Sequence, residues 1–187
     1  SSQNYFEALK IEVIKIDEIF SRVSKNEKKT AILNIGGMAN ITILGDELIG
    51  YDTGCGNVLM DYWISKKKSL SYDLDGKWAK SGSVDEELLQ KMLNEPYFLK
   101  KAPKSTGREL FNKKWLKTKL KKVPRVKNRT VQATLAELSA TTIANEVKKT
   151  QTELLVVCGG GAKNGFLMER KREKLDGVEV SSSDECG

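Results

Sequence analysis

The feature that most constrains the fold is a set of three short apolar, β-branched runs that lie close together in the first third of the chain. They are TAILNI at 30–35, ANITIL at 39–44 and LIGYD at 48–52. A glycine pair at 36–37 follows the first run, and GDE at 45–47 joins the second to the third. Connections this short are typical of hairpins, so the runs predict a three-stranded antiparallel meander. After GCGN at 54–57, apolar residues at helical spacing predict a helix with Asn57 as its N-cap.

The rest of the chain predicts mainly helices. We expect them near 17–24, at 84–93, at 109–120 and, as the longest, from 131 to 147. Two stretches, 71–82 and 94–109, are expected to be loops.

A strand–helix–strand unit is expected at the end of the chain. ELLVVC at 153–158 predicts a buried strand, three glycines turn the chain into a helix, and VEVS at 178–181 adds a short strand. Together with the meander, this order predicts an α/β fold of the ribonuclease-H-like class. Its mixed sheet would contain three antiparallel strands and then parallel strands, flanked by helices.

Composition supports one folded domain. With 187 residues, 39% of them hydrophobic, the chain can bury a core. The net charge of +7 raises the alternative of a basic nucleic-acid-binding module, but the lysines are scattered and no nucleic-acid-binding motif accompanies them. The longest apolar stretch, 154–158, is too short to span a bilayer. We therefore expect neither nucleic acid nor a membrane as a partner.

Cysteine and histidine usage narrows the chemistry. Cys55, Cys158 and Cys186 are odd in number and lack paired spacing, which indicates neither a disulfide framework nor a zinc site. This usage favours a reducing, cytoplasmic location. The chain has no histidine, so a histidine-dependent triad is excluded and any metal should be a hard cation such as Mg²⁺.

Three glycine-rich turns are the candidate ligand-binding elements. Neither a phosphate loop ending in Gly-Lys-Ser/Thr nor a complete dinucleotide fingerprint is present. At Gly36 and Gly37, backbone amides can approach an anion closely, while an ordinary hairpin is the simpler alternative. The third turn, Gly159–Gly161, lets adenine and ribose pack against bare backbone, or serves only close strand-to-helix packing.

Asp52 stands at the end of the third run, beside the second turn. Residues 54–57 open a helix whose amide end favours anions, so a carboxylate here can act as a general base on a nucleophile held nearby. The alternative, given equal weight, is a structural one in which Asp52 caps the turn by accepting hydrogen bonds from Gly54 or its neighbours.

Longer motifs make the comparison with known families specific. They are NIGGMANIT, GYDTGCGNVLMDYW, DLDGKWAKSG, PYFLKKAPKSTGRELFN, VQATLAELSATTIA and CGGGAKNGFLMERK. In this order they closely resemble the anhydro-N-acetylmuramic acid kinase family, a branch of the sugar-kinase, heat-shock-chaperone and actin superfamily with its actin-like ATPase fold. The resemblance extends from Ala31 over nearly the whole chain and corresponds to the C-terminal half of that family.

The resemblance implies an activity in peptidoglycan recycling. The family uses ATP and Mg²⁺ to open the anhydro ring of the amino sugar with water and to phosphorylate its 6-oxygen. The family's catalytic aspartate maps onto Asp52, which would deprotonate the attacking water. Thr53, Gly54 and Asn57 would shape the sugar pocket.

The resemblance also implies a nucleotide site. Residues that would approach the ATP phosphates or magnesium are Asn34, Gly36, Gly37 and Asn40. Residues that would border adenosine are Gly159, Gly160, Gly161 and Asn164. No protein ligand to the metal is assigned. Residues 104–108, KSTGR, either bind an anionic group or brace the loop. Asp73, Asp75 and Gly76 are expected to form a turn rather than a metal site, and Tyr62 and Trp63 to be core residues rather than sugar platforms.

Departures from the family pattern and both chain ends suggest a fragment. Cys55 replaces a usual proline, which puts the rigidity of the turn in question, and Thr130 replaces a usual aspartate at a helix start. The family's N-terminal phosphate motif is absent. We expect residues 1–28 to be a lead-in segment and residues 29–187 to be the C-terminal lobe of a two-lobed kinase, truncated at both ends. The fragment is expected to be inactive alone, and the whole protein is expected to form a homodimer. Alternatives are another sugar or carboxylate kinase of the superfamily and a nucleotide-dependent scaffold.

Overall fold

The computed structural model describes residues 28–121, 123 and 125–182. Its centre is one five-stranded sheet in the order β3-β2-β1-β4-β5. The strands are β1 (Thr30–Ile35), β2 (Met38–Leu44), β3 (Ile49–Cys55), β4 (Leu154–Cys158) and β5 (Glu179–Ser182). β1, β2 and β3 pair antiparallel, whereas β4 pairs parallel with both β1 and β5. The predicted meander and the mixed ribonuclease-H-like sheet are therefore confirmed.

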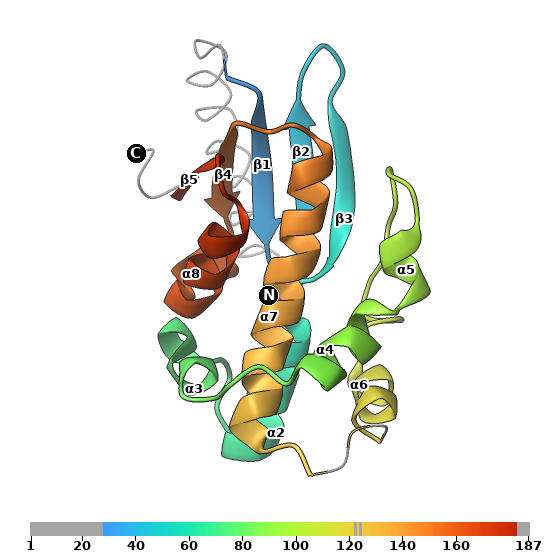
Figure 1. Cartoon of the computed structure of the whole chain (residues 1–187), viewed down its shortest axis with the longest axis vertical. Coiled ribbons are helices and arrows are strands. Elements are labelled where there is room, and N and C mark those ends of the chain that lie inside the picture. The colour runs from blue at the N-terminus through green and yellow to red at the C-terminus, as the bar shows by residue number, and fades with distance from the viewer. Residues whose placement is uncertain (1–27, 122, 124, 183–187) are drawn as a thin grey trace, which may run out of the picture.

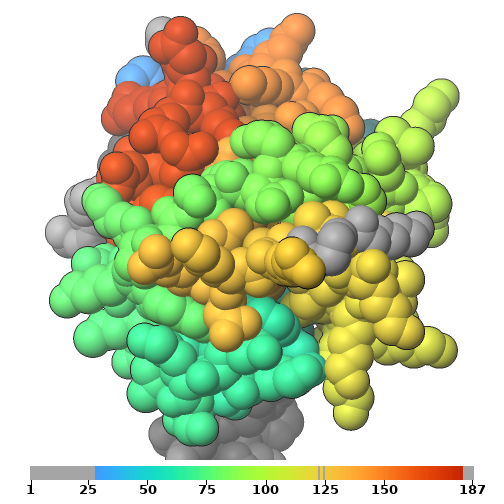
Figure 2. All heavy atoms as spheres, turned by 60° about the horizontal axis from the view of Figure 1, so that its bottom comes forward, coloured from blue at the N-terminus to red at the C-terminus, as the bar shows by residue number. Residues whose placement is uncertain are grey.

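Helices cover the sheet and extend beyond one end of it (Figure 1). They are α2 (Val58–Lys68), α3 (Lys77–Lys80), α4 (Glu86–Leu93), α5 (Pro96–Leu99), α6 (Lys113–Leu120), α7 (Asn128–Lys149) and α8 (Gly165–Lys174), with 3₁₀ turns η1 (Leu74–Gly76) and η2 (Gly160–Lys163). Beyond the sheet, α2, α3, α4 and α6 surround the first turns of α7 (Figure 2).

The core lies between the sheet and α7. Alternate residues of β1, Ala31, Leu33 and Ile35, are fully buried in the same cluster as Leu135 and Leu138 of α7. Because strand side chains alternate between faces, Asn34 and its neighbours across the sheet point to the opposite face. The long helix therefore supports the sheet from behind and leaves a row of polar residues on the other side.

Several element boundaries differ from the predictions because polar side chains cap backbone amides. The predicted loop at 71–82 contains η1 and α3, since the Asp73 carboxylate accepts hydrogen bonds from the Trp78 and Ala79 amides. The predicted loop at 94–109 contains α5, which Pro96 begins with a preset φ angle. The helix expected near 17–24 lies outside the described residues.

Helix starts account for two further differences. α6 begins at Lys113 instead of Glu109 because the Asn112 side chain caps it. Asn57 stands at the N-cap position of α2, as predicted, but its side chain accepts no capping hydrogen bond. α7 begins at Asn128, and its N-cap residue, Lys127, likewise makes no side-chain capping hydrogen bond. Among the described residues, no helix has the length and apolarity needed to cross a membrane.

Candidate functional site

The first two glycine turns are bonded directly to each other. The carbonyl of Gly36 accepts the Asn57 amide at 2.8 Å, and the carbonyl of Gly37 accepts the amides of Gly56 at 2.9 Å and Val58 at 3.0 Å. A Cβ atom on Gly56 would lie 2.3 Å from the Gly36 oxygen, so only glycine permits this approach. The prediction that the amide end of α2 attracts an anion is wrong for these three amides, because the first turn already uses them.

The third turn packs against the first strand. A Cβ atom at Gly159, where φ is 82°, would lie 2.3 Å from Asn34 Oδ1, and one at Gly161 would lie 2.3 Å from Ile35 Cγ2. By contrast, a Cβ atom at Gly160 would meet nothing nearer than Asn57 Nδ2 at 4.0 Å. Gly159 and Gly161 therefore serve close packing, the structural alternative, whereas Gly160 faces open space.

Four polar residues form one row across the sheet. Cys158 pairs with Asn34, Asn34 with Asn40, and Asn40 with Asp52. Residues paired directly across neighbouring strands share a face, and all four are half-buried. The strand register thus brings the predicted phosphate-side residues Asn34 and Asn40 into line with the predicted catalytic Asp52.

Residues 104–108, called the strap from here on, hold Asp52. Its Oδ2 accepts hydrogen bonds from Ser105 Oγ at 3.1 Å and from the Thr106 amide at 2.9 Å. Its own amide donates to the Lys104 carbonyl at 3.0 Å, and its carbonyl accepts the Tyr97 hydroxyl at 2.8 Å. Asp52 therefore does not cap its own turn; it is oriented by a segment about fifty residues away in sequence.

A buried ion pair anchors the strap. Lys104 Nζ lies 2.7 Å from Glu146 Oε1 of α7, and both side chains are almost fully buried. Burial alone raises the pKa of Glu146, but the hydrogen bonds and charges of Lys104 and Lys149 outweigh burial and hold that pKa below its usual value. Tyr51 donates to the same carboxylate at 3.3 Å, and burial followed by the Glu146 charge raises the pKa of Tyr51 to about 12. Lys104 thus braces the loop.

A pocket of about 370 Å³ joins the second and third turns. It is lined by Asn57, Met60, Asp61, Tyr72, Asp73, Leu74, Asp75, Gly160, Lys163 and Asn164. Of the predicted site residues, the pocket brings Asn57, Gly160 and Asn164 together. No spacing pattern points to Asp61, Tyr72 or Lys163 as site residues, because they come from separate segments and meet only in the folded chain.

Two of the pocket's carboxylates serve the local backbone. Asp73 caps α3, and Asp75 Oδ1 accepts the Gly165 amide at 3.0 Å, so this segment forms the predicted turn. Asp61 differs, since burial raises its pKa while the charge of Arg108 opposes that rise. In residues 28–121, 123 and 125–182, no cluster of three or more His, Cys, Asp or Glu could hold a metal ion.

Two residues expected to shape the sugar pocket are internal. The Thr53 side chain is fully buried and donates to the Ala39 carbonyl at 3.2 Å. Gly54 has φ of 149°, and a Cβ atom there would lie 2.8 Å from the ring of Phe98. Side-chain contact between Thr53 and a sugar is therefore not supported, and both residues hold β3 in place.

Cys55 lies in a well-supported turn. It is buried, and burial raises the pKa of its thiol to about 12 despite the nearby Ser139 hydroxyl. Ser139 donates to the Gly56 carbonyl at 2.8 Å. The second turn is thus held by α7 as well as by the first turn.

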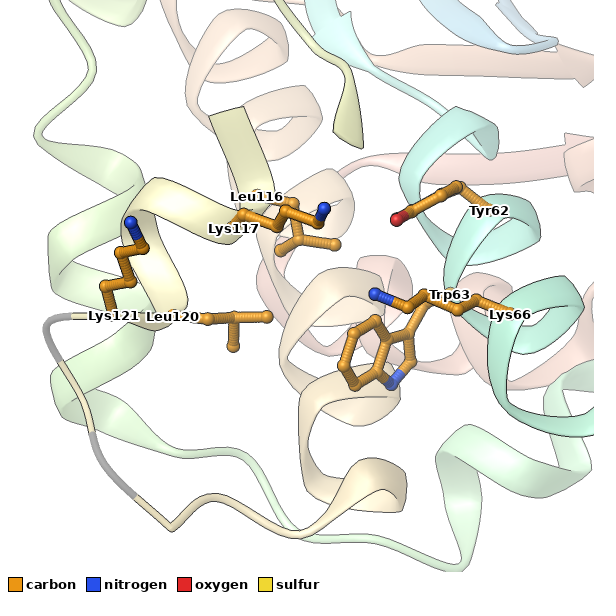
Figure 3. Close-up of a pocket in the computed structure, with 7 residues that line it drawn as sticks. All are labelled: Tyr62, Trp63, Lys66, Leu116, Lys117, Leu120 and Lys121. Carbon is orange, nitrogen blue, oxygen red and sulfur yellow. The ribbon is translucent and has the colours of Figure 1, made fainter. Parts of the chain in front are cut away.

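A second hollow, of about 290 Å³, lies between α2 and α6 (Figure 3). Its lining is Tyr62, Trp63, Lys66, Leu116, Lys117, Leu120 and Lys121. The Trp63 indole is buried and donates to the Asn128 carbonyl at 2.9 Å, which confirms its expected core role. None of the predicted catalytic or binding residues lines this hollow.

The sheet, the joined turns and the pocket define an α/β domain of the actin-like ATPase class. Two solved structures share the fold. One is the activator of the 2-hydroxyisocaproyl-CoA dehydratase from Clostridium difficile with bound ADPNP, with a TM-score of 0.53 at 13% identity over 86% of this chain and 58% of that one. The other is component A of the (R)-2-hydroxyglutaryl-CoA dehydratase from Acidaminococcus fermentans. Its TM-score is 0.52 at 16% sequence identity, and the match covers 81% of this chain and 54% of that one.

Within this class, the chain belongs to the anhydro-N-acetylmuramic acid kinase family, whose model matches residues 17–187. It is 58% identical over 176 residues to the anhydro-N-acetylmuramic acid kinase of Sulfurimonas denitrificans, covering 90% of this chain and 47% of that protein. It is 49% identical over 161 residues to the anhydro-N-acetylmuramic acid kinase of a Sulfurovum species, and this match covers 86% of this chain and 45% of that protein. The chain therefore spans about half the length of these curated relatives.

Proposed function

We propose that this chain is the C-terminal lobe of a kinase that uses ATP to open 1,6-anhydro-N-acetylmuramic acid with water and to phosphorylate its 6-oxygen. The observation that carries this proposal is the geometry of Asp52. One of its oxygens is held by Ser105 and Thr106, and the residue lies in the middle of β3, in register with Asn40, and not at the strand end that the sequence predicted. A general base depends on such fixed geometry more than on residue type.

Asp52 would remove a proton from water as the water oxygen bonds to the anomeric carbon. The bond from that carbon to the 6-oxygen breaks, and the released 6-oxygen bonds to the terminal phosphorus of ATP while the bond to ADP breaks. Because Oδ2 already accepts two hydrogen bonds, we assign proton removal to Oδ1.

For the nucleotide, we propose phosphates near Asn34, Gly36, Gly37 and Asn40, and the nucleoside in the pocket beside Gly160 and Asn164. Asn57, which was expected on the sugar side, lines the same pocket. Gly159 and Gly161 would contribute indirectly, because their close packing against β1 positions Gly160 beside the nucleoside. The oxygen donors beside the first turn are carboxamides, which suits Mg²⁺ held mostly by ATP phosphates and water. The metal would stabilise negative charge on the transferred group.

The remaining parts of the proposal concern the whole protein. A preceding lobe would supply the other wall of the cleft, since the chain spans about half of its relatives. We therefore expect little kinase activity from residues 1–187 alone. A homodimer, a cytoplasmic location and a role in peptidoglycan recycling rest on the family resemblance.

The test is ADP release by the two-lobed protein with the anhydro sugar and with ordinary N-acetylmuramic acid. Turnover on the anhydro sugar alone supports water-coupled phosphorylation. Equal turnover on both sugars, or turnover only on the open one, favours an ordinary sugar kinase in which Asp52 deprotonates a hydroxyl. No release with either sugar favours the nucleotide-dependent scaffold.

A further inference from the structure

Arg108, at the end of the strap, points its cation at the first glycine turn. Its Nη2 and Nε atoms lie 3.5 Å and 4.0 Å from the position that a Cβ atom on Gly37 would occupy. The side chain is exposed, and within the described part of the chain its guanidinium makes no hydrogen bond or ion pair. An unpaired guanidinium beside a ligand-binding turn can bind an oxyanion through two parallel hydrogen bonds.

The backbone on both sides of Arg108 is fixed. Two residues earlier, the Thr106 amide bonds to Asp52 at 2.9 Å. On the other side, Asn112, which caps α6, donates to the Arg108 carbonyl at 3.2 Å. The guanidinium therefore starts from an anchored backbone and reaches the joined turns from the Asp52 side.

Within the described residues, no carboxylate forms an ion pair with Arg108. The positive charge of Arg108 opposes the rise of the Asp61 pKa on burial, but in the part of the chain that the structure describes the two side chains form no ion pair. Lys104, the other strap cation, is already paired with Glu146. Of the two strap cations, Arg108 is thus the one left for a ligand.

We propose that Arg108 binds the transferred phosphoryl group, as the terminal phosphate of the nucleotide before the reaction and as the sugar 6-phosphate after it. The inference deepens the proposed function and rests on it. Arg108 follows Ser105 and Thr106, which hold Asp52, and its guanidinium lies beside Gly37 of the first turn. The strap thus connects the proposed base to the turn where we propose that the phosphates bind.

The chemical role of Arg108 is electrostatic. As the 6-oxygen forms its bond to phosphorus and the bond to ADP breaks, negative charge spreads over the phosphoryl oxygens. The guanidinium stabilises that charge and neither gives nor takes a proton. The strap then has two functions, since Ser105 and Thr106 orient the base and Arg108 contacts the phosphoryl group.

The test compares Arg108→Gln and Arg108→Lys in the two-lobed protein, with Lys101→Gln as the control that removes an exposed charge from the same loop. Calorimetry measures the affinity for ADP, for a non-hydrolysable ATP analogue, and for N-acetylmuramic acid with and without its 6-phosphate. Arg108→Gln should weaken the two ligands that carry the transferred phosphate about 10-fold and change the others less than about 2-fold. Its kcat should fall about 100-fold, with Arg108→Lys intermediate and Lys101→Gln unchanged.

Two results would overturn the assignment. Equal affinity losses for ADP and the ATP analogue would show that Arg108 does not contact the terminal phosphate. Equal affinity losses for N-acetylmuramic acid with and without its 6-phosphate would make a group common to both sugars, such as the carboxylate, the ligand of Arg108. The binding measurements need no turnover, so they test Arg108 even where wild-type ADP release contradicts the proposed function.

Discussion

The Ser105 hydroxyl donates a hydrogen bond to Asp52 Oδ2 at 3.1 Å, across fifty-three positions of sequence. The neighbouring Thr106 amide donates to the same oxygen at 2.9 Å. A carboxylate held through one oxygen keeps the other in a fixed direction. The strap therefore sets the direction of Asp52 Oδ1, the atom to which we assign proton removal in the proposed reaction.

Replacing Ser105 with alanine should lower kcat about 10-fold in the two-lobed protein. A hydrogen bond to a charged group contributes about 1.5–3 kcal/mol, and losing about 1.4 kcal/mol of it in the transition state lowers the rate about 10-fold. The KM values should change little, because the Thr106 amide still positions the carboxylate. Steady-state kinetics of ADP release measures both constants.

Two matched variants complete the comparison. Ser105→Thr keeps the hydroxyl and should retain most of the rate. Asp52→Asn keeps the shape but removes the base, and kcat should fall roughly 10²–10⁴-fold. If Ser105→Ala changed KM alone, Ser105 would contact substrate instead of orienting Asp52.

The buried pair of Lys104 and Glu146 should dominate the stability of the strap. Glu146→Gln leaves the Lys104 ammonium buried without its carboxylate, which should cost roughly 3–5 kcal/mol of unfolding free energy at neutral pH. The exposed pair of Arg170 and Glu173 offers the control, because Glu173→Gln should cost only about 0–1 kcal/mol. Urea unfolding measures both.

The same pair predicts a pH dependence. The pKa of Glu146 is lowered in the folded protein from an ordinary value of 4.5. Its contribution to stability is therefore fully present above pH 4.5 and is lost as the pH falls through the folded pKa. The stability difference between wild type and Glu146→Gln should shrink in that acid range. A difference that stays constant down to complete acid unfolding would contradict the assignment.

Substituting alanine at two adjacent glycines of the third turn should have different effects, one on nucleotide affinity and the other on stability. At Gly160 the nearest atom to an added Cβ is Asn57 Nδ2, at 4.0 Å, so folding should be unaffected while the methyl group enters the pocket. We expect nucleotide affinity to fall about 10-fold, equivalent to about 1.4 kcal/mol. At Gly161 the added atom would lie 2.3 Å from Ile35 Cγ2, and the overpacking should destabilise the fold by about 1–3 kcal/mol.

Thermal unfolding and nucleotide titration separate the two effects. Gly45→Ala is the control, because its nearest neighbour would be the Glu47 carbonyl at 3.7 Å and its turn is remote from the pocket. Equal destabilisation by Gly160→Ala and Gly161→Ala would mean that Gly160 also serves packing.

Local sequence patterns were sufficient to predict the sheet. The runs at 30–35, 39–44 and 153–158 are short, β-branched and bounded by glycine, and each became a strand within one or two residues. The order of antiparallel and then parallel strands followed from connection length. These features depend on neighbours in sequence, which is why a single sequence reveals them.

The site depended on contacts that local patterns do not encode. The Gly36 carbonyl meets the Asn57 amide only after the two turns dock, so the sequence predicted a free helix end where the structure has a bonded one. Likewise, nothing in the spacing of Asp52 and Ser105 indicates that they touch. Thr53 follows Asp52 in the motif, but strand alternation turns its side chain into the core.

Lys171 of α8 is buried and has no carboxylate partner among the described residues. Its side chain is fully buried, and its only hydrogen bond in the described part of the chain goes to Met168 Sδ at 3.1 Å. Burial, with a smaller effect from the Arg172 charge, lowers the pKa of Lys171 from 10.5 to about 7. The folded state therefore disfavours the ammonium form.

Stability should consequently rise with pH through the alkaline range. Between pH about 7 and 10.5 the unfolded chain binds more protons at Lys171 than the folded chain, so deprotonation favours folding. Lys171→Met removes the penalty, and this variant should be more stable than wild type at pH 7, by at most about 4 kcal/mol, with a flatter pH profile. Lys148→Met, which removes an exposed ammonium from α7, should leave the profile unchanged. Urea unfolding at pH 7 and pH 9.5 measures the difference. A Lys171→Met variant less stable than wild type at both pH values would show that the ammonium finds a stabilising partner in the folded protein.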